Sequence, residues 1–342
     1  MATPVRIAMV GLGWWGKKMV TVMQAVPSEL TVVCAVEPQA DIVREFCAER
    51  KIALYTDLAQ ALADPKVDAV VLATPHELHE TQIAQAVAAG KHVFCEKPLA
   101  LTRAGAVKAV EACAARGLVL GMGHERRFEP PVSEMIEAAE SGALGRLLQI
   151  EANFSHDKFL SLDASNWRLK ANHAPAAGMT ATGIHLTDLS VRLLGPASDV
   201  RVVCENLASE FPQGDTMSAH IRFAGGGTAY VSATLVTPFI SRFAVYGTKG
   251  WIEVRDKAHV ESPDGWVVTK ASTGSAIESY EVPPAEPVRD NLLAFARAIR
   301  GEQDYPITGA QLIDNISLLE AIVRSADTGL VEKVGWKSAV GE

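Results

Sequence analysis

The first 124 residues alternate short apolar runs with alanine-rich segments of helical spacing. We expect strands at 5–10, 31–36, 68–73, 91–95 and 118–122, and helices near 15–26, 39–50, 57–63, 76–89 and 103–116. Strands separated by helices in this way form right-handed βαβ units, whose parallel sheet is covered on both faces. The alternation therefore predicts an α/β domain over residues 1–124.

The pattern changes near residue 126, and 342 residues exceed the roughly 250–300 at which a single core stops growing. Residues 228–235 show the period-2 pattern of a strand with two different faces. We predict a second α/β domain over 125–342, with a large, mostly antiparallel, open sheet. Its expected helices are 131–141, 288–300 and 309–327, and its other strands are 147–154, 199–207, 216–224, 242–247, 251–255 and 265–270.

Composition limits the classes of partner. The formal net charge of −8 argues against nucleic acid, because binding a phosphate backbone needs a basic surface. We find no signal-peptide pattern, and no apolar stretch approaches the roughly 20 residues of a membrane span. The five cysteines are an odd number without CxxC spacing, which indicates a reducing compartment. We expect a cytoplasmic protein that acts on a small molecule, without nucleic-acid or membrane contact.

A glycine-rich turn, Gly11-Leu12-Gly13-Trp14-Trp15-Gly16, lies between the first expected strand and a helix. In this context GxGxxG indicates dinucleotide binding, although a purely structural turn is the alternative. The three glycines would permit the tight turn, the approach of the pyrophosphate and close helix–strand packing. Glu37 ends the second strand, where its carboxylate can bind the adenosine ribose and repel a 2′-phosphate. We expect NAD, with NADP possible because Arg44 lies within helical reach of such a phosphate.

Glu96-Lys97-Pro98 follows the apolar run 91–95. A lysine at the end of a buried strand is costly unless it has a partner or a function. Oxidation of an alcohol requires removal of its hydroxyl proton, and a partly buried lysine beside a positive nicotinamide ring suits that task. The alternative is a lysine that extends to solvent or pairs with Glu96.

These motifs, with Ala73-Thr74-Pro75 and Ala89-Gly90-Lys91-His92-Val93, make the chain resemble the Gfo/Idh/MocA oxidoreductase family. The resemblance is strongest over 5–128 and returns at Trp167-Arg168 and Gly178–Gly195. It implies an N-terminal Rossmann domain and a C-terminal α/β domain whose open sheet forms homodimers or homotetramers.

The same resemblance implies hydride transfer between NAD(P) and a sugar, cyclitol or related secondary alcohol. Lys97 would be the catalytic acid or base, and His185 would hydrogen-bond the reacting oxygen, although a histidine satisfied within the core is the alternative. The residues expected at the cofactor are Gly11, Gly13, Trp14, Trp15, Gly16, Glu37, Thr74, Pro75, His79, Glu96 and Lys97.

One position departs from the family pattern. Many members carry an aspartate four residues before the site histidine, where this chain has Ala181. An alanine can neither orient a hydroxyl nor share a proton, so Thr180, Thr182 or Asn166 would have to supply a hydrogen bond. Asp188 could act at the site, or pair with Arg192 one helical turn later.

Further polar and aromatic residues give a set of substrate-binding candidates: Arg126, Trp167, Arg168, Thr182 and Asp188. Arginines clamp carboxylates bidentately, but Arg126, Arg127 and Arg168 could equally hold the domains together. His76 and His79 form an HxxH pair without the further ligands that zinc needs, so we expect no metal.

We therefore expect an NAD(P)-dependent dehydrogenase or reductase that acts on a secondary alcohol or ketone of a sugar, cyclitol or sugar-acid-like molecule. A dihydrodiol or imine-type dehydrogenase or reductase on the same fold is the first alternative, and the missing aspartate makes it more plausible. A sensor or regulatory protein that binds NAD(P) without catalysis is the second. Lys97 and His185 argue against that sensor.

Overall fold

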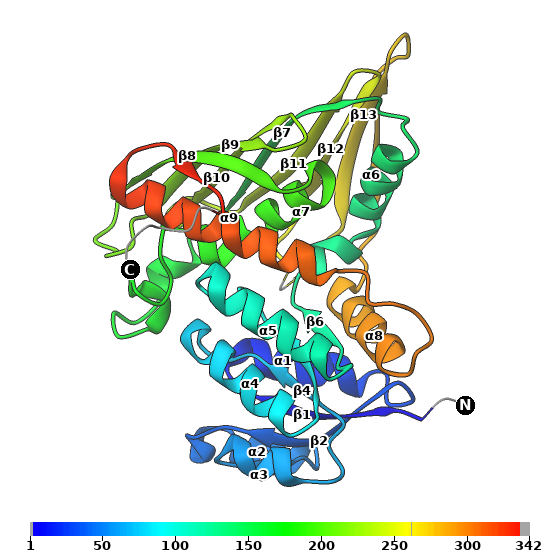
Figure 1. The fold of residues 1–342 in the computed structure, drawn as a ribbon, viewed down its shortest axis with the longest axis vertical. Coiled ribbons are helices and arrows are strands. Elements are labelled where there is room, and N and C mark those ends of the chain that lie inside the picture. Colours follow the sequence, from blue (N-terminus) through cyan, green and yellow to red (C-terminus); the bar gives the residue numbers. More distant parts are fainter. Residues whose placement is uncertain (1–2, 261, 336–342) are drawn as a thin grey trace. The chain divides into compact units, whose positions relative to one another are not determined.

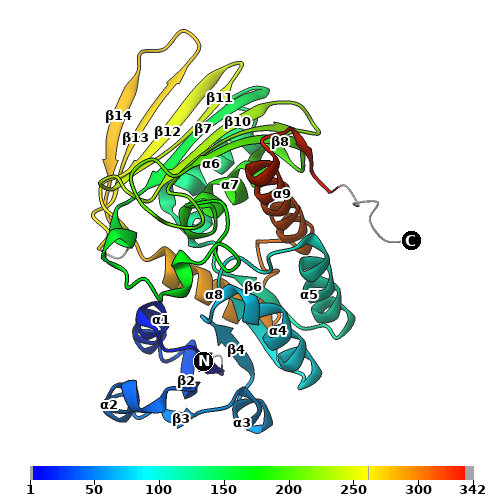
Figure 2. The same ribbon diagram turned by 90° about the vertical axis from the view of Figure 1, so that its left-hand side faces the viewer.

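The computed structural model describes residues 3–260 and 262–335, which divide into two compact units (Figures 1 and 2). Among the described residues, the first unit comprises 3–125 and 287–312, and the second comprises 126–260, 262–286 and 313–335. The boundary at 125/126 lies one residue from the expected one at 124/125. The return of 287–312 to the first unit was not expected from the sequence.

The first unit is built on a six-stranded parallel sheet with the strand order β3-β2-β1-β4-β5-β6. Its order reverses between β1 and β4, which is the position where doubly wound sheets bind ligands. The strands are β1 (Val5–Val10), β2 (Leu30–Val36), β3 (Ala53–Tyr55), β4 (Ala69–Leu72), β5 (His92–Cys95) and β6 (Leu120–Met122). The helices are α1 (Trp14–Gln24), α2 (Arg44–Glu49), α3 (Leu58–Ala63), α4 (His79–Ala88), α5 (Arg103–Ala115) and α8 (Pro287–Ile299).

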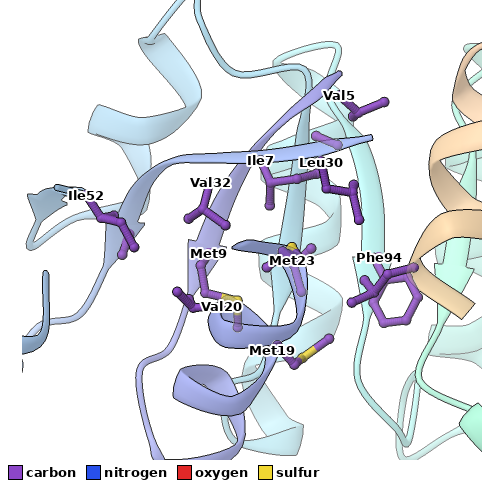
Figure 3. Close-up of a cluster of buried hydrophobic side chains, with 14 of the residues drawn as sticks. Val5, Ile7, Met9, Met19, Val20, Met23, Leu30, Val32, Ile52 and Phe94 are labelled. Carbon is purple, nitrogen blue, oxygen red and sulfur yellow. The ribbon is translucent and has the colours of Figure 1, made fainter. Parts of the chain in front are cut away.

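The core of this unit lies between β1 and α1. Met19, Val20 and Met23 are three and four residues apart, so they share one face of α1 and lie beside Met9 and Phe94 (Figure 3). Each such side chain contributes roughly 1.5–3 kcal/mol when fully buried. This packing fixes the start of α1, and hence the glycine turn that precedes it.

Helix α8 completes the first unit. The ring of its Phe295 lies 5.5 Å from that of Phe94, and Asn291 Nδ2 donates a hydrogen bond of 2.8 Å to the Met122 carbonyl. The Tyr305 hydroxyl accepts from the Met122 amide at 3.0 Å. The end of β6 is therefore held by a segment more than 160 residues later in the chain.

The second unit contains a nine-stranded sheet in the order β14-β13-β12-β11-β7-β10-β9-β8-β15. All neighbours are antiparallel except β7 and β10, which are parallel. Its strands are β7 (Leu147–Ser155), β8 (Ala197–Glu205), β9 (Thr216–Phe223), β10 (Thr228–Thr234), β11 (Ile240–Gly247), β12 (Gly250–Asp256), β13 (Trp266–Ser272), β14 (Glu278–Val282) and β15 (Glu332–Lys333).

Helices cover one face of this sheet. They are α6 (Pro130–Glu140), α7 (Ile184–Leu194) and α9 (Gly309–Thr328), and Figure 2 shows them on the same side of the strands. Buried and more exposed residues alternate along β9 and β10 because one strand face packs against these helices. In the described part of the chain no helix lies against the other face, so the sheet is open as predicted.

The predicted fold class is confirmed, and the differences concern short elements. Strands β3, β14 and β15 were not predicted, because two or three residues, or a strand as polar as Glu278–Val282, carry little signal. The helix expected over 39–50 is broken at Val43, whose φ of −125° lies outside the helical range, into a 3₁₀ turn (Ala40–Ile42) and α2. Within residues 3–260 and 262–335, no helix is long and apolar enough to cross a bilayer.

Candidate functional site

The glycine turn between β1 and α1 has the geometry of a nucleotide-binding loop. Gly11 adopts a φ of +88°, and a Cβ there would lie 2.7 Å from the Ala73 carbonyl oxygen. A Cβ at Gly16 would lie 2.0 Å from the Gly11 carbonyl oxygen, so the start of α1 sits directly on the turn. A Cβ at Gly13 would meet nothing within 4 Å. The fold itself therefore requires glycine at 11 and 16, while Gly13 leaves open space at the N-terminus of the helix.

Glu37 at the end of β2 is bound to this turn. Its carboxylate accepts hydrogen bonds from the Leu12 amide at 3.1 Å and from the Gln39 amide at 3.2 Å. Arg44, the cation that could have favoured a 2′-phosphate, pairs with Asp41 at 2.7 Å on the surface. The carboxylate, and not the guanidinium, thus lies beside the glycine turn.

The two tryptophans of the turn differ in burial. The ring of Trp14 is 50% exposed, whereas Trp15 packs against the core of the first unit. Their ring centroids are 5.1 Å apart in an edge-to-face arrangement. Trp14 therefore presents a large apolar surface to solvent at the first residue of α1.

His79 ties the segment after β4 to the segment after β5. Its Nδ1 lies 2.7 Å from the Pro98 carbonyl oxygen and its Nε2 lies 3.1 Å from the Thr74 carbonyl oxygen. Burial lowers the pKa of His79, against the opposing effect of its contacts with the Pro98 and Thr74 carbonyls. The Lys97-Pro98 peptide is cis. Both loops of the predicted site thus depend on one buried side chain.

His79, one member of the HxxH pair, therefore has both ring nitrogens in contact with backbone carbonyl oxygens. The rings of His76 and His79 are 6.0 Å apart. Among the residues that the structure describes, no group of three or more His, Cys, Asp or Glu side chains could hold a metal ion.

Glu96 and Lys97 follow β5, and Glu96 is only 7% exposed. Its carboxylate packs against the backbone of Gly123, where a Cβ would lie 2.5 Å from it, and its Oε2 accepts the Lys97 amide at 3.3 Å. Burial and then the charge of Glu125 raise the pKa of Glu96 to about 7, against the opposing effects of Trp15 and Lys97. A carboxyl group that titrates near neutrality therefore lies directly beside the candidate catalytic lysine.

The cofactor candidates share one edge of the first sheet. Strands β1, β4 and β5 are neighbours and parallel, so the Gly11 turn, Thr74 and Lys97 all follow the carboxyl ends of adjacent strands. Thr74 Oγ1 donates to Gln82 at 2.6 Å, and Pro75 precedes a short 3₁₀ turn. The strand order therefore brings these segments to one edge of the sheet.

The second unit carries His185 on α7, directly after a π-helical turn, Met179–Gly183. His185 is 4% exposed, and its ring lies 6.3 Å from the ring of Phe154 on β7. Thr182 donates its hydroxyl to the Gly178 carbonyl at 3.2 Å, inside the turn. π-helical turns of this kind are rare in proteins. Those that occur are often found at functional sites.

Ala181, the position of the missing aspartate, has a packing role. It lies on the π-helical turn and packs against an apolar cluster of Phe159, Leu169 and Leu235. A carboxylate here would be placed against apolar side chains, which costs free energy unless it is paired. The alanine therefore suits its surroundings, and the chain does not hold a family-type aspartate at this point.

Asp188 forms a buried ion pair with Arg127. Asp188 Oδ2 accepts from Arg127 Nε and Oδ1 from Arg127 Nη2, both at 2.7 Å, and the side chains are 1% and 5% exposed. The suggested Asp188–Arg192 pair was wrong, since Arg192 pairs with Glu140 instead. Helical spacing could not have indicated this partner, because Arg127 lies 61 residues before Asp188 in the chain.

Arg126 is engaged inside the second unit. Its guanidinium donates to Ser241 at 2.8 Å and to Asp256 at 2.7 Å, and it lies 5.3 Å from the centre of the Phe154 ring. With 4% exposure, this arginine holds strands of the sheet together.

Arg168 differs from the other arginines. It stacks on the ring of Trp167 at 4.4 Å, and it forms no ion pair with any carboxylate within the described ranges 3–260 and 262–335. Burial lowers the pKa of Arg168. A partly buried cation without a counter-charge is suited to bind an anionic group.

A group of rings beside His185 was not predicted from the sequence. Phe154 contacts His156 at 6.4 Å, His259 at 5.9 Å and Phe239 at 6.2 Å between ring centroids. Phe154 and His156 are two residues apart at the end of β7, a spacing that could have signalled a shared face. No spacing signal connects them to His259, which is about 100 residues later.

Comparison with known proteins is consistent with this geometry. Residues 5–124 match the model of an oxidoreductase family with an NAD-binding Rossmann fold, and residues 132–253 match the GFO/IDH/MocA C-terminal domain. The 1,5-anhydro-D-fructose reductase of Ensifer adhaerens is 30% identical over 82% of this chain and 83% of its own. The scyllo-inositol 2-dehydrogenase (NAD(+)) of Bacillus subtilis is 25% identical over 99% of both chains. A solved levoglucosan dehydrogenase, in complex with NADH, is 22% identical, covers 97% of this chain and 99% of its own, and superposes with a TM-score of 0.86.

Proposed function

Because the chain belongs to the Gfo/Idh/MocA family of oxidoreductases, we propose that it transfers a hydride between NAD and a secondary alcohol or ketone of a sugar, cyclitol or sugar acid. Family membership makes the chain an NAD(P)-dependent dehydrogenase or reductase with an NAD-binding Rossmann domain. The substrate and the residues that act on it are the proposal.

Lys97 is the acid or base in this proposal. In the oxidative direction Lys97 Nζ takes the proton of the substrate hydroxyl while hydride leaves the carbon, and His185 hydrogen-bonds the reacting oxygen. NAD, when bound, accepts the hydride. The observation that carries the assignment is the place of Lys97 at the carboxyl end of β5, next to the strands that end at the glycine turn and Thr74.

The cofactor-binding set remains as the sequence predicted it: Gly11, Gly13, Trp14, Trp15, Gly16, Glu37, Thr74, Pro75, His79, Glu96 and Lys97. Gly13 leaves room for the pyrophosphate, and Glu37 supports a preference for NAD over NADP, since its carboxylate lies at the turn while Arg44 is paired with Asp41. His79 would act indirectly, by fixing the loops that carry Thr74 and Lys97.

Among the substrate-binding candidates, Arg168 has the strongest support. Its charge lacks a carboxylate partner in the described residues, so we propose that it binds an anionic group, either a phosphate of the cofactor or a carboxylate of the substrate. Trp167 would orient it by stacking. The other candidates already form hydrogen bonds within the second unit: Arg126, Thr182 and Asp188. We therefore assign them a supporting role at the site.

Turnover and binding test the proposal separately. The purified protein would be mixed with NAD⁺ or NADP⁺ and a panel of sugars, inositols, sugar acids and cis-dihydrodiols, while the absorbance of reduced cofactor is followed. We expect turnover with NAD⁺ on at least one polyol, and a loss of roughly 10²–10⁴-fold in kcat for Lys97→Ala with NADH binding retained. The exposed Lys170→Ala is the matched control.

Two results would contradict the assignment. Full activity of Lys97→Ala would remove the lysine from the mechanism. Tight NADH binding without turnover across the panel would favour the sensor, and turnover confined to dihydrodiols would favour the dihydrodiol dehydrogenase.

We also propose that the open face of the second sheet forms a homodimer or homotetramer in a reducing compartment such as the cytoplasm. The support is exposed apolar side chains on that sheet, including Val203 at 51% and Tyr230 at 49%, and five cysteines that are all free thiols.

A further inference from the structure

A buried amide oxygen in the second unit has no hydrogen-bond partner, and it belongs to a residue that the proposed mechanism does not use. Gln213, on the connection between β8 and β9, is 5% exposed. Its side-chain Oε1 accepts no hydrogen bond from any residue within 3–260 and 262–335. Buried polar atoms of folded proteins are nearly always paired, either with the protein or with an ordered molecule. The unpaired oxygen therefore indicates a position for a donor that does not come from the described chain.

The other polar atom of the same amide fixes its orientation. Gln213 Nε2 donates to the carbonyl oxygen of Arg168 at 2.9 Å. A carbonyl oxygen can only accept, so the amide atom that faces it must be the nitrogen, and the atom left unpaired is the oxygen. The two polar atoms of an amide are about 2.2 Å apart, given its bond lengths. Oε1 therefore lies close to the backbone of Arg168, the residue proposed to bind an anionic group.

Gln213 also contacts the segment that leads to His185. Its backbone carbonyl oxygen accepts from the Ala177 amide at 2.7 Å. The side chain and the backbone of this one residue thus hold both ends of the stretch 168–177, which is followed by the π-helical turn and α7. In the second unit, the proposed function gives ligand contacts to Arg168, at the start of this stretch, and to His185, beyond its end.

The connection that carries Gln213 is itself held by a buried carboxylate. Asp215, at 0% exposure, accepts from the amides of Ala208 and Ser209 at 2.8 Å each and from that of Leu207 at 3.1 Å. Three successive amides on one carboxylate fix the course of the loop next to Gln213. A side chain on a loop held in this way keeps its position before a ligand arrives, as a selective binding group requires.

The chemistry of the unpaired atom restricts what can bind it. An amide oxygen is an acceptor, so its partner must carry an O–H or an N–H. An ionised carboxylate, or a phosphodiester of the cofactor, has acceptors only, so the anion proposed for Arg168 cannot satisfy Oε1. A hydroxyl of a polyol can donate to Oε1 and still accept from another group. A ligand that pairs with both residues therefore needs a free hydroxyl in addition to any anionic group.

We propose that Gln213 is a specificity-determining residue, whose Oε1 accepts a hydrogen bond from a free hydroxyl of the substrate at a carbon other than the one that is oxidised. This inference rests on the proposed function, since it takes the substrate to be polyhydroxylated and bound by the second unit. It goes further by requiring one particular hydroxyl, which the family resemblance leaves open. A substrate analogue that cannot donate at that position leaves a buried acceptor unpaired and binds less well.

Replacement of single hydroxyls tests this assignment without turnover. D-Glucose, D-xylose and myo-inositol, and the monodeoxyfluoro analogues of each, would be titrated calorimetrically into the NADH-saturated protein. Fluorine replaces the hydroxyl at similar size but cannot donate a hydrogen bond. In the wild-type protein we expect an analogue fluorinated at the recognised position to bind roughly ten- to a hundredfold more weakly than its parent.

Gln213→Met couples this loss to the residue. Methionine has a similar length but no amide, so the parent should bind as weakly as that analogue, and the difference between the two should fall below about threefold. Loss of the hydrogen bond to the Arg168 carbonyl would instead weaken parent and analogue equally. Gln303→Met replaces an exposed glutamine and should leave every affinity unchanged.

Two further measurements distinguish the acceptor of Gln213 from its donor. Gln213→Glu keeps an oxygen acceptor and loses the N–H, so it should retain the preference for the parent over the analogue. A crystal structure of the wild-type protein with NADH and the tightest-binding of the three polyols needs no variant. A ligand oxygen, and not an ordered water, should lie within about 3.0 Å of Oε1.

The outcomes separate this proposal from the proposed reaction. A water on Oε1 in that complex, an equal loss for parent and analogue in Gln213→Met, or loss of the preference in Gln213→Glu would overturn the role of Gln213, while turnover of a polyol would leave the reaction standing. Selectivity that depends on Gln213, without oxidation or reduction of any polyol, would support the role and contradict the reaction. If none of the three polyols binds, the proposal for Gln213 fails, and the turnover panel alone decides on the reaction.

Discussion

At the scale of single residues, the ionisation of Glu96 gives the site a property that can be measured. In the folded chain burial and Glu125 hold the pKa of Glu96 at about 7, above its usual 4.5. The folded state therefore keeps a proton that the unfolded state loses, and the free energy of unfolding falls as pH rises from about 4.5 to 7.

Glu96→Gln should remove this contribution. Relative to the variant, we expect the wild-type protein to lose about 1–3 kcal/mol of unfolding free energy between pH 5 and pH 8, at about 1.4 kcal/mol per pKa unit. Urea titrations at several pH values measure it. Glu125→Gln should reduce this pH dependence. It removes the negative charge that, after burial, raises the pKa of Glu96 most. Parallel pH profiles for wild type and Glu96→Gln would contradict the assignment.

The Arg127–Asp188 pair predicts a second effect at this scale. Asp188→Asn leaves a buried guanidinium without its counter-charge, so we expect a loss of roughly 3–5 kcal/mol in unfolding free energy. Asp41→Asn is the matched control, since it breaks the exposed Arg44–Asp41 pair and should cost less than about 1 kcal/mol. Denaturant unfolding of both variants measures these two losses in unfolding free energy. Similar losses in the two would mean that Arg127 finds another partner.

At the scale of elements, the glycine turn separates folding from cofactor binding. Gly16→Ala places a Cβ 2.0 Å from the Gly11 carbonyl oxygen and must shift α1, so it should destabilise the protein by about 1–3 kcal/mol. Gly13→Ala meets nothing within 4 Å in the folded chain, and should leave the melting temperature nearly unchanged. If Gly13 serves the pyrophosphate, the same variant should weaken NADH binding at least tenfold. Unaltered NADH fluorescence titrations would refute that role.

The turn before α7 shows where sequence reasoning reaches its limit. Ala176 and Ala177 have left-handed φ values of 58° and 49°. This conformation favours glycine, so an alanine in the sequence does not predict it. The adjoining Met179–Gly183 turn is π-helical. A contact distant in the chain accompanies this conformation, since Ala177 donates its amide to the Gln213 carbonyl at 2.7 Å. Local propensity has no access to such a partner.

Other parts of the site were open to prediction for an equally physical reason. The glycine turn, Glu37 and Lys97 follow strands β1, β2 and β5 of one parallel sheet, so their place at one edge follows from the parallel strand order alone. The Arg127–Asp188 pair and the rings around Phe154 join segments that are far apart in the chain and have no shared period. Those contacts needed the structure.

At the scale of the whole molecule, the open sheet face predicts association. Tyr230 stacks on His220 at 4.7 Å and remains 49% exposed, in the central part of that sheet. Tyr230→Arg should reduce the mass measured by light scattering toward that of the 36.5 kDa monomer, because it places charge in the apolar part of the interface. Ile277→Arg, at an exposed residue between β13 and β14, is the control. An unchanged mass in Tyr230→Arg would exclude this face.

The long connection from β7 to β8 bears on how ligand selectivity can change in a chain of this fold. Asn153 on β7 bonds Ser232 on β10, 79 residues later, and the connection between β7 and β8 contains His156, Lys158, Arg168 and His185. The connection starts at the centre of the sheet, where the His156 amide donates to the Thr234 carbonyl at 3.0 Å. If residues of this connection bind the substrate as proposed, substitutions in it would alter ligand recognition while leaving every strand pairing in place. Selectivity and scaffold can therefore evolve, or be engineered, as separate modules.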